Sequence, residues 1–170
     1  MSEPIREWIV ASGLVVFDGS LLLVKNTRRG GHEDWSTPGG VIDAEDPDLI
    51  SGLTREVSEE TGLIVTDWVG PVYTVVATAP DLAWRMRCEV YRATAFRGEL
   101  VVADPDGIVT EAMFVAPGEC ESLLAGCPRW VREPLAAWIA DRWDVPDTRR
   151  FHYEVRGTDR ASLKVTRREG

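Results

Sequence analysis

The stretch Gly39–Leu63, GGVIDAEDPDLISGLTREVSEETGL, decides the fold of this chain. Its second half predicts a helix from about Pro47 to Thr61. Asp46 is a suitable N-cap and proline is a favourable first helical residue, while Gly62 can take the left-handed conformation that ends a helix. Both ends of the helix are therefore marked by local signals.

The apolar residues of this helix lie on one face. Leu49, Leu53 and Val57 follow one another at intervals of four residues, so we expect them to face the core. Gly52 stands in mid-helix, where a glycine lowers helix stability by about 1 kcal/mol relative to alanine. We therefore expect another part of the chain to approach the backbone closely at this point.

Three carboxylates lie near the C-terminal end of the same helix, where they destabilise it. Glu56 and Glu60 are four residues apart and repel each other. Together with Glu59 they also lie at the negative end of the helix dipole, at a cost of roughly 0.3–1 kcal/mol each, and Arg55 offsets only part of it. Such a cluster, with oxygen ligands alone, suits Mg²⁺ or Mn²⁺ better than zinc. The alternative is a solvated acidic face.

The order of these residues resembles the Nudix box of the Nudix hydrolase family (MutT-like), in which a glycine and a glutamate precede the pattern REUxEExGU. The run REVSEETGL from Arg55 matches every fixed position of that pattern. Fifteen positions separate Gly40 from Arg55, where the family spacing needs fourteen, so one residue is inserted. Three acids, Asp43, Glu45 and Asp46, compete for the place of the family's first glutamate.

The resemblance implies an α/β fold, the Nudix α/β/α sandwich with a mixed β-sheet. It also implies a pyrophosphatase activity that hydrolyses a nucleoside diphosphate linked to another group and depends on Mg²⁺ or Mn²⁺. Glu56 and Glu60 would be metal ligands, Glu59 a third ligand or the base that orients water, and the Gly40 carbonyl a backbone ligand. Arg55 would hold the glutamates in place. A nucleoside triphosphate and a nucleotide sugar both remain open as substrates.

The remaining elements are expected from hydrophobic patterning and turn residues. Two strands are expected to form a hairpin at Asp18-Gly19. A loop then leads to the box, and strands, two helices and a terminal hairpin follow the box helix. The expected strands are Trp8–Phe17, Leu21–Asn26, one or two within Leu63–Ala79, Trp84–Phe96 and Ile108–Val115, and the expected helices are Glu119–Leu124 and Arg129–Trp143.

Basic and aromatic residues outside the box are candidates for substrate binding. The loop before the box carries Arg28 and Arg29, which could counter the charge of phosphates or simply be solvated. It also carries Trp35, which could stack on a base or pack under the loop. Arg85 and Arg87 share one face of a later strand, which could face a ligand cleft or be a half-exposed edge.

One further acid is a candidate for catalysis. Glu111 begins the run EAMFVAPGE, which resembles the late Nudix segment where some family members place an assisting base or metal ligand. Without the resemblance it would be a surface residue.

Composition limits the remaining function classes. The 170-residue chain is 44% hydrophobic and 28% charged, which fits one globular domain. No apolar run approaches roughly 18 residues and no signal peptide is recognisable, so we expect a cytoplasmic protein without a membrane span. Cys88, Cys120 and Cys127 lack the spacing of a zinc site or a disulfide framework, and we assign them no chemistry.

Residues 149–170 form a basic segment after an acidic body. Seven basic and three acidic side chains give this segment a net charge of +4, which leaves −13 for residues 1–148. We expect residues 1–148 to be the Nudix domain and residues 149–170 a C-terminal β-hairpin extension of it. Phe151, Tyr153 and Val155 alternate with polar residues, which favours docking on the same subunit or on a second copy in a homodimer. Nucleic acid is not an expected partner of the acidic body. The alternative function is a Nudix-like regulatory domain that binds a nucleotide and uses the basic tail to contact nucleic acid or a partner.

Overall fold

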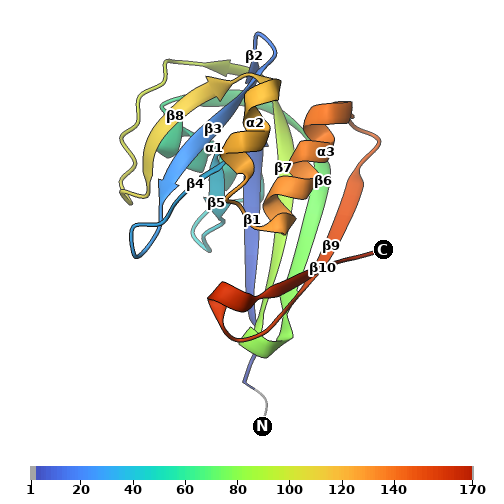
Figure 1. Cartoon of the computed structure of the whole chain (residues 1–170). Coiled ribbons are helices and arrows are strands. Elements are labelled where there is room, and N and C mark those ends of the chain that lie inside the picture. The colour runs from blue at the N-terminus through green and yellow to red at the C-terminus, as the bar shows by residue number, and fades with distance from the viewer. Residues whose placement is uncertain (1–2, 170) are drawn as a thin grey trace.

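The computed structural model describes residues 3–169 and places a large mixed sheet between helices (Figure 1). The large sheet has six strands in the order β10-β9-β6-β7-β1-β5, and in a second, antiparallel sheet β3 pairs with β2, β4 and β8. The strands are β1 (Arg6–Leu14), β2 (Val16–Phe17), β3 (Ser20–Thr27), β4 (Glu33–Ser36), β5 (Gly39–Val41), β6 (Ile64–Ala79), β7 (Trp84–Arg97), β8 (Val109–Val115), β9 (Arg149–Arg156) and β10 (Lys164–Arg168).

The helices pack on both faces of the large sheet, which confirms the α/β/α sandwich. Helix α1 (Leu49–Thr61) covers one face with Leu53 and Val57, as its apolar stripe predicts. Helices α2 (Pro117–Leu124) and α3 (Arg129–Asp141) cover the other face. Within the described part of the chain, no helix has the length and apolar character that a bilayer crossing requires.

The expected hairpin at Asp18-Gly19 is confirmed, but the strand before it is divided. Asp18 and Gly19 both have positive φ, 50° and 79°, as a tight two-residue turn requires. The expected single strand Trp8–Phe17 is wrong, because β1 belongs to the large sheet and β2 to the small one. The chain thus changes sheet at the buried Val15, and this change brings the two sheets together beside the box.

Two further expectations around the box need correction. The segment expected to be a loop before the box contains β4, which pairs with β3. The N-cap of α1 is Asp48 and not Asp46, because the Asp48 side chain accepts a hydrogen bond from the Ser51 N–H at 2.7 Å. The other end is as expected, since Gly62 has φ 80° and its N–H donates to the Ser58 carbonyl.

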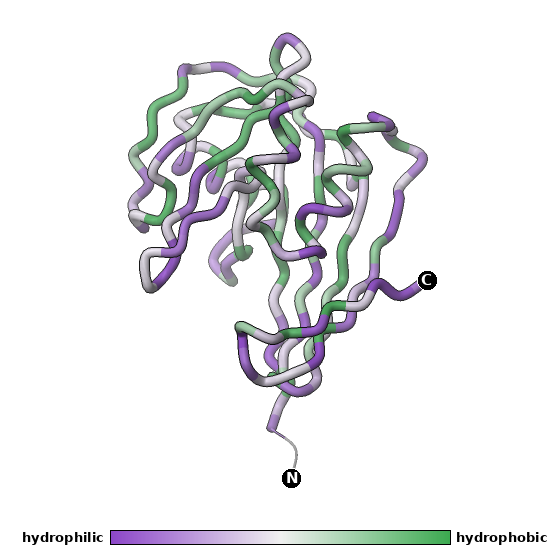
Figure 2. The backbone as a smooth tube through the Cα atoms, viewed as in Figure 1, coloured by the Kyte–Doolittle hydropathy of each residue, from purple (hydrophilic) through white to green (hydrophobic). Residues whose placement is uncertain are grey.

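The C-terminal segment completes the large sheet. Strand β9 runs parallel to β6, and β10 pairs with β9. Phe151, Tyr153 and Val155 are at most 4% exposed, so the expected docking of this segment on its own chain is confirmed. The end of the chain beyond this buried face is hydrophilic (Figure 2).

Candidate active site

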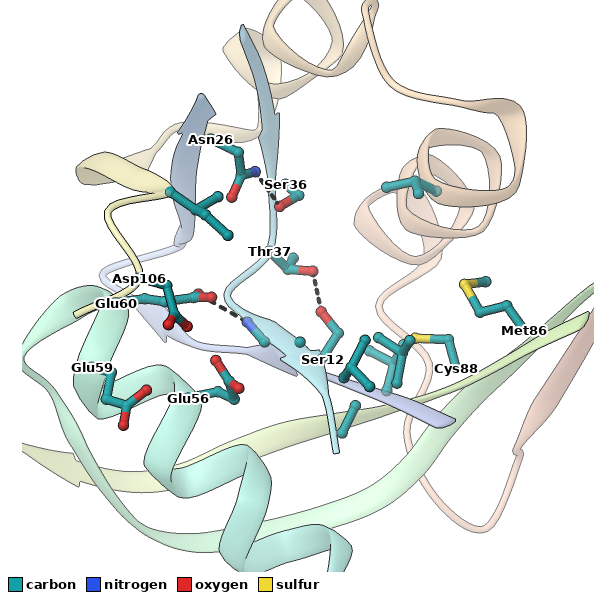
Figure 3. Close-up of a pocket in the computed structure, with 18 of the residues that line it drawn as sticks. Ser12, Asn26, Ser36, Thr37, Glu56, Glu59, Glu60, Met86, Cys88 and Asp106 are labelled. Carbon is teal, nitrogen blue, oxygen red and sulfur yellow. Dashed lines mark hydrogen bonds between the residues drawn. The ribbon is translucent and has the colours of Figure 1, made fainter. Parts of the chain in front are cut away.

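A cavity of about 720 Å³ lies where the box, the second sheet and α3 meet. Carboxylates line one end of it, and the hydroxyls of Ser12 and Thr37 lie in its middle (Figure 3). The opposite end is apolar and includes Met86 and Cys88 from β7 (Figure 3). Leu135 from α3 is a further apolar residue of the lining. The cavity therefore has an acidic end, which suits a cation, and an apolar end, which suits an uncharged group.

The acidic end is formed by the three glutamates of α1, all of which line the cavity. Burial raises the pKa of Glu56 to about 7 and that of Glu60 to about 8, and neighbouring carboxylates add to both effects. The Gly39 N–H donates to Glu60 Oε2 at 3.1 Å, which opposes the increase for Glu60 but does not cancel it. Burial is the largest cause for both residues, and for Glu56 the nearby charge of Arg55 opposes it only in part.

Two glycines allow β5 to lie against the glutamates. Gly39 has φ 150°, and a Cβ there would lie 2.2 Å from the Ala11 carbonyl oxygen. A Cβ at Gly40 would lie 3.1 Å from the Glu56 carboxyl carbon. Glycine at these positions keeps the backbone beside the carboxylates open.

Arg55 connects the helix to the loop before it. Its Nε and Nη2 donate to the two carboxylate oxygens of Asp46, each at 2.9 Å. Its Nη1 lies 3.1 Å from Glu59 Oε2 and 3.3 Å from Glu56 Oε1. The bidentate contact with Arg55 holds the pKa of Asp46 below its usual range. Arg55 therefore holds two of the glutamates, as expected.

Of the three acids that compete for the first position of the box, Asp46 makes the closest contacts with Arg55. Asp46 binds Arg55 at both oxygens, whereas Asp43 reaches Arg55 only at 3.4 Å and Glu45 is exposed. A Cβ at Gly52 would lie 2.8 Å from Asp46 Oδ2. The close approach expected at Gly52 is thus the approach of the Asp46 carboxylate, which the inserted residue in the loop does not prevent.

The donor set at the acidic end fits a divalent metal ion, although the side chains do not yet converge on one. Among residues 3–169, no three His, Cys, Asp or Glu side chains are grouped as they would be around a bound metal. The donors are oxygens only, and burial disfavours the charged forms of Glu56 and Glu60, which a bound cation would stabilise. These are the preferences of a hard cation such as Mg²⁺ or Mn²⁺.

Glu111 lies outside the cavity, and two other acids line it. Glu111 is an exposed residue of β8 opposite Lys25 and does not line the cavity. Asp104 and Asp106 line it from the preceding loop, where the charge of Asp104 acts on Glu60 and that of Asp106 acts on Glu56; Figure 3 labels Asp106 at the acidic end. The sequence signal for these two acids was the turn DPDG, which places two carboxylates in one tight loop. Only the packing of that loop against α1 shows that they border the cavity.

Only one of the three candidates before the box reaches the cavity. Arg28 lines it, and its guanidinium is held by Asp34 through bonds of 2.9 and 3.1 Å. Arg29 is exposed and lies outside the cavity lining. Trp35 packs against the core under α2 and α3, and its carbonyl accepts a hydrogen bond from the Cys127 thiol, so the packing interpretation is correct.

Arg85 and Arg87 lie on the face of β7 that points away from the cavity. Their exposed side chains lie near Glu7 and Glu89 respectively. The alternate residues, Met86, Cys88 and Val90, face the cavity instead. The strand therefore does border a cleft, but with its apolar side. Burial raises the pKa of the Cys88 thiol to about 12, which keeps it neutral.

The fold and this site define a hydrolase of the Nudix class. The NUDIX domain model matches residues 8–139, so the chain belongs to the Nudix family, whose hydrolases cleave pyrophosphate bonds. No curated protein matched the chain.

Solved structures agree with this assignment. A MutT NUDIX hydrolase from Burkholderia pseudomallei is 26% identical, with 66% of this chain and 85% of that chain covered and a TM-score of 0.58. A MutT protein from Bacillus halodurans is 20% identical, with coverages of 94% and 97% and a TM-score of 0.62. An ADP-ribose pyrophosphatase from Streptococcus suis is 19% identical, with coverages of 84% and 98% and a TM-score of 0.53. The last two show likeness of fold.

Proposed function

We propose that this Nudix hydrolase cleaves the diphosphate bond of a nucleoside diphosphate linked to another moiety and requires Mg²⁺ or Mn²⁺. The observation that carries the proposal is the row of carboxylates of α1, two of them held by Arg55, at one end of an approximately 720 Å³ cavity whose other end is apolar. A polyanionic substrate can approach such carboxylates only when a cation neutralises both.

The roles proposed for the box residues follow from their positions. Glu56 and Glu60, with the Gly40 carbonyl, would hold the cation, which would neutralise phosphate charge and favour attack at phosphorus. Glu59 would be a third ligand or the base that orients the attacking water. Water then forms a bond to one phosphorus, and the bridging P–O bond breaks to release the second phosphate group. Arg55 acts by positioning the glutamates.

Two residues outside the box complete the proposal. Arg28 lines the cavity while Asp34 holds its guanidinium, so it is placed to bind a phosphate oxygen. Asp106 takes the assisting acidic role that the sequence suggested for Glu111. Replacing Asp106 by asparagine should lower turnover at least tenfold, whereas Glu111→Gln should remain within about twofold of the parent. The opposite order would show that the cavity lining has been misassigned.

The substrate class proposed is a nucleoside triphosphate or a nucleotide sugar, and the apolar end would receive a ring. The names of the neighbours, MutT proteins and an ADP-ribose pyrophosphatase, cover both kinds of diphosphate. The test is a panel of nucleoside triphosphates and nucleotide sugars with Mg²⁺, scored for phosphate, pyrophosphate and nucleoside monophosphate. Release of a nucleoside monophosphate that stops in EDTA is expected. Binding without release of any product would favour a regulatory domain.

The rival function, a regulatory domain with a basic tail, has less support. Several basic side chains of the tail are engaged within the chain, as Arg149 pairs with Asp141, Arg156 with Asp81 and Arg168 with Glu154. These contacts reduce the charge that the tail can offer to a phosphate backbone. A homodimer would have to form through a surface other than the buried face of the tail, and light scattering would detect it.

A further inference from the structure

Asn26 is a buried polar residue that faces the cavity near the end of β3. It is 5% exposed and lines the cavity, at a strand position that follows four buried apolar residues and Lys25. The pairing of β3 with β8 shifts register between Lys25 and Asn26. Such irregularities redirect side chains and are frequent beside active sites.

The orientation of the Asn26 amide is fixed by its neighbours on β4. Its Nδ2 donates to Asp34 Oδ1 at 3.0 Å and to Ser36 Oγ at 2.9 Å, the second of which Figure 3 shows. An ionised carboxylate only accepts hydrogen bonds, so the nitrogen must face Asp34. Asp34 is itself held by Arg28. A flip of the Asn26 amide would therefore place its Oδ1 against Asp34 Oδ1, with no hydrogen between the two oxygens.

All three hydrogen bonds of the Asn26 side chain, two to side chains and one to the Asp34 backbone carbonyl, use Nδ2, so its carbonyl oxygen has no donor among the described residues. No fully buried side-chain nitrogen or oxygen in this part of the chain lacks a partner. Oδ1 is therefore reachable from the cavity. Beside it, Ser36 Oγ accepts from Asn26, which leaves the serine O–H able to donate.

We propose that Asn26 is a specificity-determining residue whose Oδ1 accepts a hydrogen bond from an N–H or O–H group on the nucleoside part of the substrate. The proposal rests on the proposed function, because it assumes that the diphosphate lies at the glutamates. Asp34 connects phosphate binding with nucleoside binding, because its carboxylate positions both Arg28, proposed to bind the phosphate, and Asn26, proposed to bind the nucleoside. The donor can belong to the base or to the sugar.

A fixed and nearly buried acceptor discriminates strongly between ligands. When a ligand lacks the matching donor, it displaces water from Oδ1 and supplies nothing in return, which costs more than the bond itself contributes. We therefore expect the protein to bind a ligand with the donor about 10- to 100-fold more tightly than the same ligand without it. The apolar end of the cavity cannot provide this discrimination.

The experiment measures the affinity of non-hydrolysable α,β-methylene nucleotides by calorimetry in Mg²⁺, so it does not depend on turnover. Each pair of ligands differs by one donor group. The pairs adenosine/purine riboside and guanosine/inosine differ by an amino group, and uridine/N3-methyluridine by a ring N–H. Ribonucleotides differ from their 2′- and 3′-deoxy forms by a hydroxyl. The variants are Asn26→Leu, which is similar in size and apolar, and Asn26→Gln, which keeps an amide but displaces it. Thr27→Val is the matched control on the next residue of β3.

The parent and Thr27→Val should show a 10- to 100-fold preference within at least one pair, and both Asn26 variants should reduce it to about twofold or less. The pair that responds identifies base or sugar as the source of the donor. A preference that survives in the Asn26 variants, or the absence of any preference in the parent, overturns the proposal. If neither variant folds, the side-chain amide NMR signals of Asn26 in the parent provide the test, and no shift on nucleotide binding overturns it. If the parent discriminates within a pair through Asn26 but hydrolyses no nucleotide, the hydrolase proposal fails and the proposal for Asn26 stands.

Discussion

Replacing Glu60 by glutamine should stabilise the metal-free protein, and the gain should grow as the pH rises. Glutamine has the same size as glutamate and can still accept the Gly39 N–H bond, but it cannot carry the charge that burial disfavours. The pKa of Glu60 is raised from 4.5 to about 8 in the folded state. At about 1.4 kcal/mol per pKa unit, the substitution should raise the free energy of unfolding by at most about 5 kcal/mol.

The sign follows from proton linkage. The folded state keeps the Glu60 proton to higher pH than the unfolded chain does. The stability of the parent that depends on this proton is therefore fully present below pH 4.5 and is lost as the pH rises through about 8. Side-chain relaxation toward the cavity reduces the effect, and we expect about 2–3 kcal/mol at pH 9 and little difference at pH 5. The free energy of unfolding in EDTA, from urea titrations at both pH values, measures this directly.

An exposed glutamate on a different helix provides the control. Glu121→Gln on α2 should change the free energy of unfolding by no more than about 0.5 kcal/mol at either pH. An equal gain for Glu60→Gln at pH 5 and pH 9, or a loss at pH 9, would refute the reasoning that an uncompensated buried charge lies at the end of α1.

Three other perturbations test the same account. Millimolar Mg²⁺ or Mn²⁺ should raise the melting temperature at neutral pH, and EDTA should reverse the increase; no shift would speak against a cation at the glutamates. Gly52→Ala should lower turnover despite its better helix propensity, because the new Cβ would displace the Asp46 carboxylate from Arg55, and unchanged turnover would show that this contact is dispensable. Truncation after Val145 removes β9 and its buried face, so we expect lost solubility by light scattering, and a soluble, active product would show that residues 149–170 are not an integral extension of the domain.

Local signals in the sequence were sufficient for the elements that carry the box. The apolar stripe of α1, its end at Gly62 and the turn at Asp18-Gly19 depend on neighbouring residues, and each is found as expected. The start of α1 was misplaced because Asp46, a good N-cap by residue type, is taken by Arg55 nine residues later. A side chain that can cap a helix can also bind an arginine, and only tertiary structure decides between them.

The composition of the cavity depended on contacts that the sequence does not reveal. Alternation along β7 separates Arg85 and Arg87 from Met86 and Cys88, but it does not show which face borders the cavity. Asp106 was overlooked because its position depends on how a loop packs against α1, far away in the sequence. The unpaired acceptor of Asn26 becomes visible only once Asp34 and Ser36 are placed beside it.

The central claim is that the carboxylates of α1 form the hydrolytic site, and the turnover of Glu59→Gln tests it most directly. The variant keeps the size of the side chain but cannot serve as a charged ligand or as the base for water. With Mg²⁺ and a substrate identified from the nucleotide panel, we predict a loss of turnover of at least a hundredfold, with Glu121→Gln remaining at the parent level. Turnover of Glu59→Gln near that of the parent, in a protein shown to be folded, would contradict the account.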